Sequence, residues 1–218
     1  MKRILFLLLA AFAAACNSSA DRWLAEDESG AAEIVMRRDT LEITAPAGLT
    51  LWLREPLRGD YRIAYAARMI TGGPAERLSD LNCFWAARDP EHPDDLEARS
   101  AWRGGVFRNY NSLDLFYVGF GGNENTTTRF RRYRGDRFGA ADSEVKPLLG
   151  EYTDPAHLLA PDSTYRITIT VAGGRTSYAV NGEELFSRRL AEGEGDGWFG
   201  LRLLTNHVVI SGFKIEYL

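Results

Sequence analysis

The stretch from Leu113 to Tyr133, LDLFYVGFGGNENTTTRFRRY, constrains the fold more than any other part of the chain. Residues 113–120 are rich in aromatic and large apolar side chains, as β-strands are. The Gly- and Asn-rich segment 121–125 interrupts this run, because both residue types tolerate the positive φ angles of tight turns. Residues 126–133 then alternate between two faces with the period of a strand. The stretch therefore predicts a β-hairpin.

Short segments of the same kind fill most of the remaining chain. Alternating apolar residues over Tyr61–Met69 and Tyr165–Val171 predict two strands whose apolar faces point inward. Asn181-Gly182 between two such runs predicts a second hairpin, and Ser211-Gly212 predicts a bulge in the last strand. About ten to twelve short strands with hardly any helical periodicity predict one all-β domain, an antiparallel sandwich of two sheets.

The N-terminal residues have the pattern of a bacterial lipoprotein signal peptide. A positive start at residues 1–3 is followed by an apolar run at 4–9, and three alanines directly precede Cys16. The apolar run is too short to span a bilayer as a helix. We therefore expect residues 1–16 to be a signal peptide that ends in a lipidated Cys16, with an ordinary secretory signal as the alternative.

The remaining chain divides into two parts by composition. Residues 17–32 are polar and are expected to form a tether or an N-terminal arm, and residues 33–218 are expected to form the sandwich domain. A lipidated Cys16 would place this domain in the cell envelope, either periplasmic or at the surface, with the membrane as a partner through its lipid anchor.

Composition and spacing exclude several functions. A formal net charge of −4 argues against a nucleic-acid partner, which a basic surface would favour. The histidines His92, His157 and His207 lie far apart without metal-ligand spacing, and Cys83 has an apolar setting. A nucleotide-binding glycine loop before a helix and the Gly-x-Ser-x-Gly elbow of serine hydrolases are both missing. No metal or cofactor is expected.

The second strand of the central hairpin carries the strongest functional signal. Arg129, Arg131 and Tyr133 share one face of this strand, whereas Arg132 points to the opposite face. Paired arginines beside an aromatic residue suit a planar, partly anionic ligand such as an acidic sugar. The alternative is an exposed strand whose arginine stems lie over apolar neighbours and whose guanidinium groups only pair with Glu124, Glu151 or other acids.

Candidates for catalysis and for further ligand contacts lie elsewhere in the chain. A lyase needs a cation to neutralise a uronate carboxylate and a Tyr or His as base and acid, whereas a hydrolase needs two carboxylates. His207, Tyr152 and Glu151 are the catalytic candidates, although each of these types is commonly structural. Further substrate-binding candidates are Asn109, Tyr110, Asn111 and Trp85.

Several longer motifs carry a resemblance to a known family. These are Ser79–Trp85, Tyr110–Leu113, Tyr117–Asn123, Thr126–Tyr133, Gly197–Gly200 and Asn206-His207. Together they resemble a bacterial concanavalin-A-like jelly-roll family of unassigned function, which is often encoded among genes for pectin and other uronate-containing glycans. The resemblance implies a jelly-roll fold and a glycan-related role, but it supplies no catalytic residues.

Two functions of different classes follow, and the arrangement of the groove separates them. The first is a lyase or hydrolase acting on a uronate- or rhamnose-containing polysaccharide, and the second is a non-catalytic carbohydrate-binding module. A structural lipoprotein without a ligand is a third possibility. An enzyme should bring Arg129 or Arg131, a tyrosine and His207 together in a groove. A binding module should instead expose flat aromatic side chains, such as Trp102 or Tyr110, without that cluster.

Overall fold

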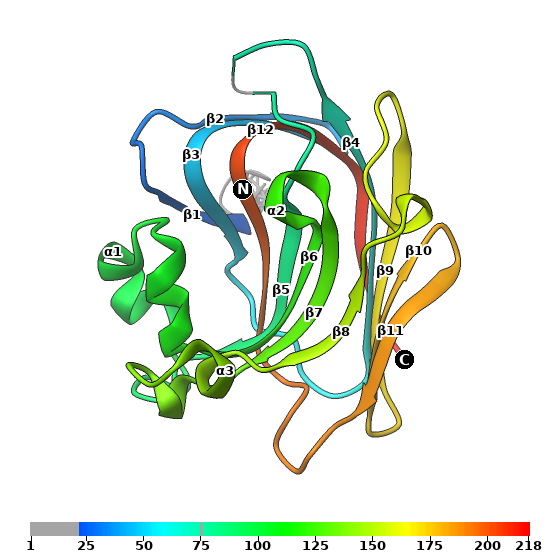
Figure 1. The fold of residues 1–218 in the computed structure, drawn as a ribbon. Helices are drawn as coiled ribbons and strands as arrows, with labels where there is room; N and C mark the ends of the chain where they lie inside the picture. The colour runs from blue at the N-terminus through cyan, green and yellow to red at the C-terminus, as the bar shows by residue number, and fades with distance from the viewer. Residues whose placement is uncertain (1–21, 75) are drawn as a thin grey trace, which may run out of the picture.

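The computed structural model describes residues 22–74 and 76–218, which form strands joined by loops with a few short helical turns (Figure 1). The strands are β1 Trp23–Asp27, β2 Glu33–Arg37, β3 Thr40–Leu53, β4 Tyr61–Ile70, β5 Leu81–Arg88, β6 Asp114–Gly121, β7 Thr127–Tyr133, β8 Leu148–Tyr152, β9 Thr164–Ala172, β10 Arg175–Val180, β11 Glu183–Arg189 and β12 Trp198–Tyr217. The helical turns are α1 Ser100–Arg103, α2 Gly122–Asn125 and α3 Asp142–Val145, with 3-10 turns at Leu96–Arg99, Phe107–Ser112, Gly135–Arg137 and Pro155–His157.

The twelve strands form an antiparallel, all-β jelly-roll sandwich whose two layers share the long strands β3 and β12. The early part of β12, from Trp198 to Arg202, pairs with β5, while its later part, from His207, pairs with β4. Between them the strand bends, because the register shifts between Leu204 and Asn206 and Thr205 has a positive φ of 53°. The front layer continues from β5 through β6 and β7 to β8, and the back layer from β4 through β9 and β10 to β11. The predicted fold class is therefore confirmed.

The main core lies between the two layers. The alternating residues of β4 and β9 point into it as predicted: Tyr61, Ile63, Tyr65, Tyr165, Ile167 and Ile169 are all buried. Both predicted hairpins form, since β6 pairs with β7 and β10 pairs with β11. The predicted bulge is present as well, because the register of β12 against β4 shifts between Ser211 and Lys214.

The N-terminal boundary of the domain differs from the prediction. Residues 23–27 belong to the segment expected to form a tether or arm, but they form β1 and pair with residues 49–53 of β3. Glu26 is 2 % exposed in this strand. The polar composition of this segment gave no sign of a buried strand. Glu26 can be buried there only because Arg103, which is distant in sequence, donates hydrogen bonds to it. Cys16 lies outside the described residues.

A lobe formed by residues 89–112 covers part of the outer surface of the front layer and includes α1 (Figure 1). Leu96 and Tyr110 of the lobe pack with Trp52 and Phe84 of the sheet in a second apolar cluster. No helix in the described ranges, 22–74 and 76–218, is long and apolar enough to cross a membrane.

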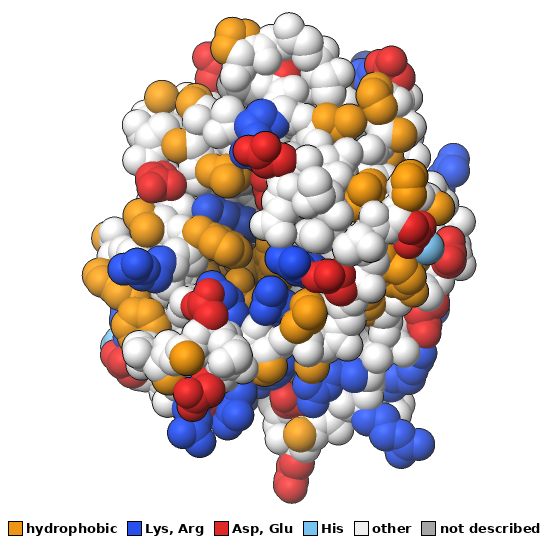
Figure 2. Space-filling view, in the orientation of Figure 1, with side chains coloured by type: hydrophobic (Ala, Val, Ile, Leu, Met, Phe, Trp, Pro, Cys, Tyr) orange, Lys and Arg blue, Asp and Glu red, His pale blue; other side chains and the backbone are white. Residues whose placement is uncertain are grey.

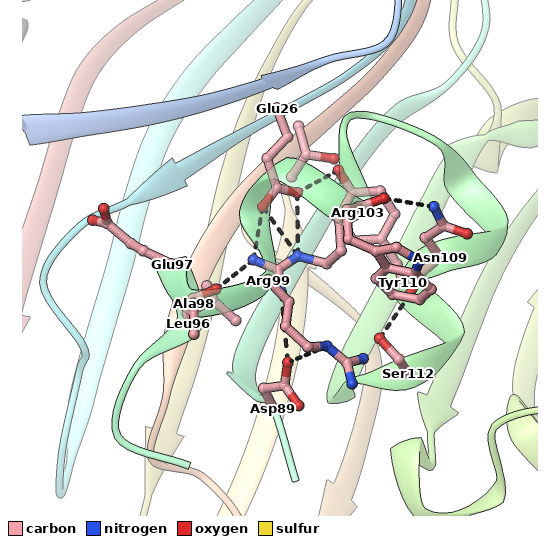
Figure 3. Close-up of polar contacts among 12 residues, drawn as sticks. Glu26, Asp89, Leu96, Glu97, Ala98, Arg99, Arg103, Asn109, Tyr110 and Ser112 are labelled. Atoms are coloured by element: carbon pink, nitrogen blue, oxygen red, sulfur yellow. Dashed lines mark hydrogen bonds and ion pairs between the residues drawn. The ribbon is translucent and has the colours of Figure 1, made fainter. Parts of the chain in front are cut away.

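Buried charges attach this lobe to β1 (Figure 3). The Arg103 guanidinium, which is fully buried, donates to Glu26 Oε1 from Nε at 3.0 Å and from Nη2 at 2.7 Å. The Tyr110 hydroxyl donates to Glu26 Oε2 at 2.6 Å, and Arg99 Nε lies 3.1 Å from Asp89 Oδ2. The lobe is therefore held in a fixed position beside the open part of the front layer.

Candidate functional site

A groove of about 370 Å³ lies on the outer surface of the front layer, between the lobe, α2 and α3. Figure 2 shows a hollow near the middle of this face, with Lys and Arg side chains around it and apolar side chains in its floor. The lining residues are Arg77, Asp80, Phe107, Tyr117, Gly119, Gly122, Asn123, Glu124, Thr127, Arg129, Arg131, Tyr133, Asp142, Lys146 and Leu204. Its volume lies within the usual range for small-molecule sites.

Strand register places the polar residues of the floor in one row across five neighbouring strands. In order from β12 to β8 the aligned residues are Arg202, Asn82, Gly119, Arg129 and Glu151. Aligned residues on adjacent antiparallel strands project from the same face of a sheet. Gly119, in the middle of the row, contributes no side chain, and the hydroxyl end of Tyr117 lies over it.

The central hairpin orients its arginines as its alternation predicts. Arg129 and Arg131 both line the groove. Arg132 points to the other face, where its Nε donates to Glu194 Oε1 at 2.8 Å and its guanidinium lies over Phe116. The two groove arginines differ in their partners, since Arg129 Nε donates to Glu151, whereas Arg131 Nη1 donates to the Lys146 carbonyl oxygen at 2.7 Å.

The groove lining carries four cationic side chains, Arg77, Arg129, Arg131 and Lys146, and three acidic ones, Asp80, Glu124 and Asp142. Asp80 lies 3.6 Å from Arg77, and Asp142 lies 3.1 Å from Lys146, so these acids are partly neutralised at the rim. Within residues 22–74 and 76–218, neither Arg131 nor Arg202 forms a salt bridge with a carboxylate. An anion entering the groove would therefore meet the Arg131 guanidinium, which has no carboxylate partner in these ranges, above the buried charge of Arg202.

Arg202 is held beneath the groove by aromatic rings and neutral acceptors. Its Nη1 donates to the Gly105 carbonyl oxygen at 2.6 Å, and its Cζ lies 5.1 Å from the ring centre of Phe107 and 5.4 Å from that of Tyr110. Burial lowers the pKa of Arg202 from its ordinary value, but arginine starts so far above neutrality that it stays charged. Arg202 therefore adds a fixed positive charge below the floor.

Two tyrosines of the groove remain protonated. Burial raises the pKa of Tyr117 and of Tyr133, and the neighbouring Arg131 and Arg202 oppose this shift only in part for Tyr133. A phenol with a raised pKa is a poor general base near neutral pH, but it is a good hydrogen-bond donor. These tyrosines suit ligand binding better than proton abstraction.

The catalytic candidates His207 and Tyr152 are not brought into the groove. His207 Nδ1 lies 3.1 Å from Glu76 Oε1 and its Nε2 lies 3.0 Å from Glu42 Oε1, and it is not a lining residue. Tyr152 follows Glu151 on β8 and therefore faces the opposite side of the sheet, where its ring stacks on His157 at 4.0 Å. The cluster expected of an enzyme is absent from the described groove.

Several predicted ligand contacts need correction because their side chains are occupied elsewhere. Trp85 is fully buried in the core between the layers, where its Nε1 donates to Thr176 Oγ1 at 2.9 Å. Tyr110 is fully buried and bonded to Glu26. The Asn109 side chain donates to the Trp102 carbonyl oxygen at 2.9 Å, and Asn111 is 8 % exposed. None of these four residues lines the groove.

Glu151 has a different role from the catalytic one considered for it. It pairs with Arg129 on the groove face of β8 but does not line the groove. The pairing with an acid that the sequence left open for the arginines is thus present at Arg129 and absent at Arg131.

Sequence reasoning missed most of the groove. Phe107 of the lobe, Tyr117 of β6 and Lys146 after α3 line the groove from segments distant in sequence, and Arg202 of β12 lies beneath Phe107. The alternation of Tyr117 and Gly119 within the central hairpin was the one available signal. Within the described residues, no group of three or more His, Cys, Asp or Glu side chains is arranged to hold a metal ion.

Comparison with known proteins assigns the family. Residues 43–213 match the family model described as "Domain of unknown function (DUF6250)". The chain belongs to the DUF6250 family. The match covers β4 to β11 completely and most of β3 and β12, and so includes every strand that lines the groove. No curated protein sequence matches the chain.

Solved structures share the fold of this DUF6250 protein at low sequence identity. A Bacillus subtilis protein of unknown function with a galectin-like fold has a TM-score of 0.68 at 18 % identity, with 92 % of each chain covered. The carbohydrate-binding module CBM66 from Bacillus subtilis has a TM-score of 0.57 at 10 % identity, covering 89 % of this chain and 95 % of that one. The exoplasmic/lumenal domain of VIP36, bound to Ca²⁺ and Man3GlcNAc, has a TM-score of 0.56 at 12 % identity, covering 91 % and 86 %. These likenesses establish the galectin-like jelly-roll fold.

Proposed function

We propose that this protein is a non-catalytic carbohydrate-binding domain whose groove takes an acidic, uronate-containing glycan. The observation that carries the proposal is the position of Arg131 in the groove. Arg131 lines the groove beside Arg129 and has no carboxylate partner among the described residues. Guanidinium groups bind carboxylates through charge-assisted hydrogen bonds, and an acidic sugar offers such a carboxylate.

The remaining groove chemistry also suits a sugar. Phe107 lines the groove and is 37 % exposed, so it offers an apolar surface to a sugar ring. The Tyr117 and Tyr133 phenols supply neutral donors for sugar hydroxyls. Trp102 is 47 % exposed on the neighbouring lobe, as expected of a binding module. CBM66 is a carbohydrate-binding module and the VIP36 domain has bound Man3GlcNAc, and because both share the fold they support this class.

The enzyme alternative, a lyase or hydrolase, has less support. A lyase would require a base near the uronate, but His207 is engaged with Glu42 and Glu76 outside the groove. The groove tyrosines have raised pKa values and hold their protons. We also propose that Cys16 carries a lipid anchor that holds the domain at the cell envelope, as its alanine-rich junction predicts.

Calorimetric titration with oligogalacturonides tests the proposal. The matched ligand is the methyl-esterified oligomer of the same length, which has the same sugar rings without the negative charge. We expect the wild-type protein to bind the acid form more tightly, and added salt to weaken that binding, because salt screens charge pairs. Arg131→Ala should weaken binding of the acid form by at least roughly tenfold, about 1.4 kcal/mol.

Arg132→Ala is the matched control variant, because Arg132 neighbours Arg131 in sequence but lies on the opposite face. It should lower thermal stability and leave affinity unchanged when binding is measured well below the melting temperature. Equal binding of the acid and ester forms, or an Arg131→Ala variant that loses only stability, would remove the proposed site. Release of unsaturated products, seen by ultraviolet absorbance, would establish the lyase instead.

A further inference from the structure

Gly119 is a glycine that lies within a strand of the groove floor, between two polar residues. It lies on β6 between Asn82 of β5 and Arg129 of β7, which are its cross-strand neighbours. Its backbone does not have the positive φ that would itself require glycine. In an extended strand, alanine is at least as favourable as glycine for the backbone. The reason for glycine here therefore lies in the space around it.

That space is occupied by the hydroxyl end of Tyr117. A Cβ added at Gly119 would lie 2.6 Å from the Tyr117 hydroxyl oxygen and 3.0 Å from its Cζ, much closer than real Cβ contacts. The Tyr117 side chain thus extends over Gly119, along the floor of the groove. The Tyr117 ring is fixed by aromatic neighbours, with centroids 5.4 Å from Phe84, 5.7 Å from Tyr133 and 5.9 Å from Phe107.

Within residues 22–74 and 76–218, the hydroxyls of Tyr61, Tyr110 and Tyr152 donate hydrogen bonds, whereas the Tyr117 hydroxyl has no hydrogen-bond partner. Arg129 uses its Nε for Glu151, which leaves its terminal nitrogens without a bonded acceptor in the same ranges. Arg131 lies two residues along the strand on the same face, roughly 6.5–7 Å further. The Tyr117 phenol and Arg129 thus border Gly119 on the groove floor, and Arg131 lies opposite Tyr117 on the same face of β7.

We propose that Gly119 and Tyr117 form the subsite that selects the uronate carboxylate, in which glycine keeps the Tyr117 hydroxyl over the floor so that it donates together with Arg129. This inference rests on the proposed function, and it identifies the uronate carboxylate as the group of the glycan that the site recognises. It makes Gly119 a specificity-determining position. The methyl group of alanine at 119 would push the hydroxyl away from the carboxylate without disturbing the strand.

A double-mutant cycle of Gly119→Ala and Tyr117→Phe tests this subsite by titration with the acid and methyl-ester oligogalacturonides. Each single variant should weaken binding of the acid form by roughly tenfold, the value of a hydrogen bond to a charged group. The double variant should bind no more weakly than the weaker single variant, because both changes remove the same hydrogen bond. Binding of the ester should change by less than about twofold, since it lacks the charge that strengthens the bond.

Tyr217→Phe is the matched control, since it removes a phenol hydroxyl from a side chain that is 67 % exposed and does not line the groove. It should bind as the wild type, and every titration is run well below the melting temperature of the variant, because the added Cβ of Gly119→Ala must displace a ring held by three aromatic neighbours. Wild-type affinity in both single variants, or additive losses in the double variant, would overturn the subsite while the proposed function stands. A wild-type protein that does not distinguish acid from ester would overturn both.

Discussion

Removal of the Glu26 carboxylate is expected to destabilise the protein strongly, because Glu26 is the main counter-charge of a fully buried arginine. Arg103 donates to it at 3.0 and 2.7 Å, and Tyr110 donates to it at 2.6 Å. Glu26→Ala would leave a buried guanidinium with only the Leu96 carbonyl oxygen and Asp89, whose Oδ2 is 3.7 Å away. Breaking a buried pair from one side costs about 3–5 kcal/mol. We expect about 3 kcal/mol, because Asp89 still compensates in part.

Urea unfolding followed by tryptophan fluorescence measures this loss. With an m-value of about 2 kcal/mol/M, a loss of about 3 kcal/mol lowers the midpoint by about 1.5 M. The control variant is Glu184→Ala, which breaks the pair with Arg175 in which both side chains are more than two-fifths exposed. Such surface pairs contribute about 0–1 kcal/mol, so its midpoint should shift by at most about 0.5 M.

A second variant separates charge from packing at this position. In Glu26→Leu combined with Arg103→Met, both charges are replaced by apolar side chains of similar length. This double variant should be clearly more stable than Glu26→Ala, because no unpaired buried charge remains. If Glu26→Ala unfolds at the same urea concentration as Glu184→Ala, Arg103 does not depend on Glu26 and the reasoning about the lobe is refuted.

Three further predictions concern the core, a histidine and the N-terminus. Ile167→Ala should cost about 2–5 kcal/mol in urea unfolding because Ile167 is 1 % exposed in the core; a loss below 1 kcal/mol would contradict this packing. The hydrogen bond of His157 to Asp154 raises the pKa of His157, so its stabilisation is present at low pH and is lost as pH rises through that raised pKa. His157→Gln should therefore lower the melting temperature more at pH 5.5 than at pH 8.5, and the opposite order would show that the pair is unimportant. Cys16→Ala should release the protein from the membrane fraction, and a variant that still sediments with membranes would exclude the lipid anchor.

The sequence by itself determined the fold class and the direction of the hairpin side chains. Period-two alternation over Tyr61–Met69 and Tyr165–Val171 was sufficient, because a half-buried strand must segregate its apolar side chains to one face. The same rule placed Arg129 and Arg131 together and Arg132 on the other side. These features depend only on residues close together in the chain, because successive side chains of a strand point to opposite faces.

The alternation of residues along a strand did not show which of its two faces is exposed to solvent. Trp85 and Tyr110 belong to motifs that suggested ligand contacts, yet both are fully buried, Trp85 between the layers and Tyr110 where the lobe packs on the sheet. Likewise, the polar segment that contains Glu26 became a strand because Arg103, 77 residues away, neutralises it. A buried charge is tolerable only with its partner, and no local pattern reveals a partner so distant.

The groove itself was decided only by tertiary structure. Arg202, Asn82, Gly119 and Arg129 come from four strands that are spread over 121 sequence positions, and they form one row because the strands pair in a particular register. A shift of one residue in any pairing would turn that strand's side chain to the opposite face. Strand alternation fixes which residues share a face, whereas long-range pairing fixes which of these residues meet across the sheet. The site depends on the second property, which a single sequence does not display.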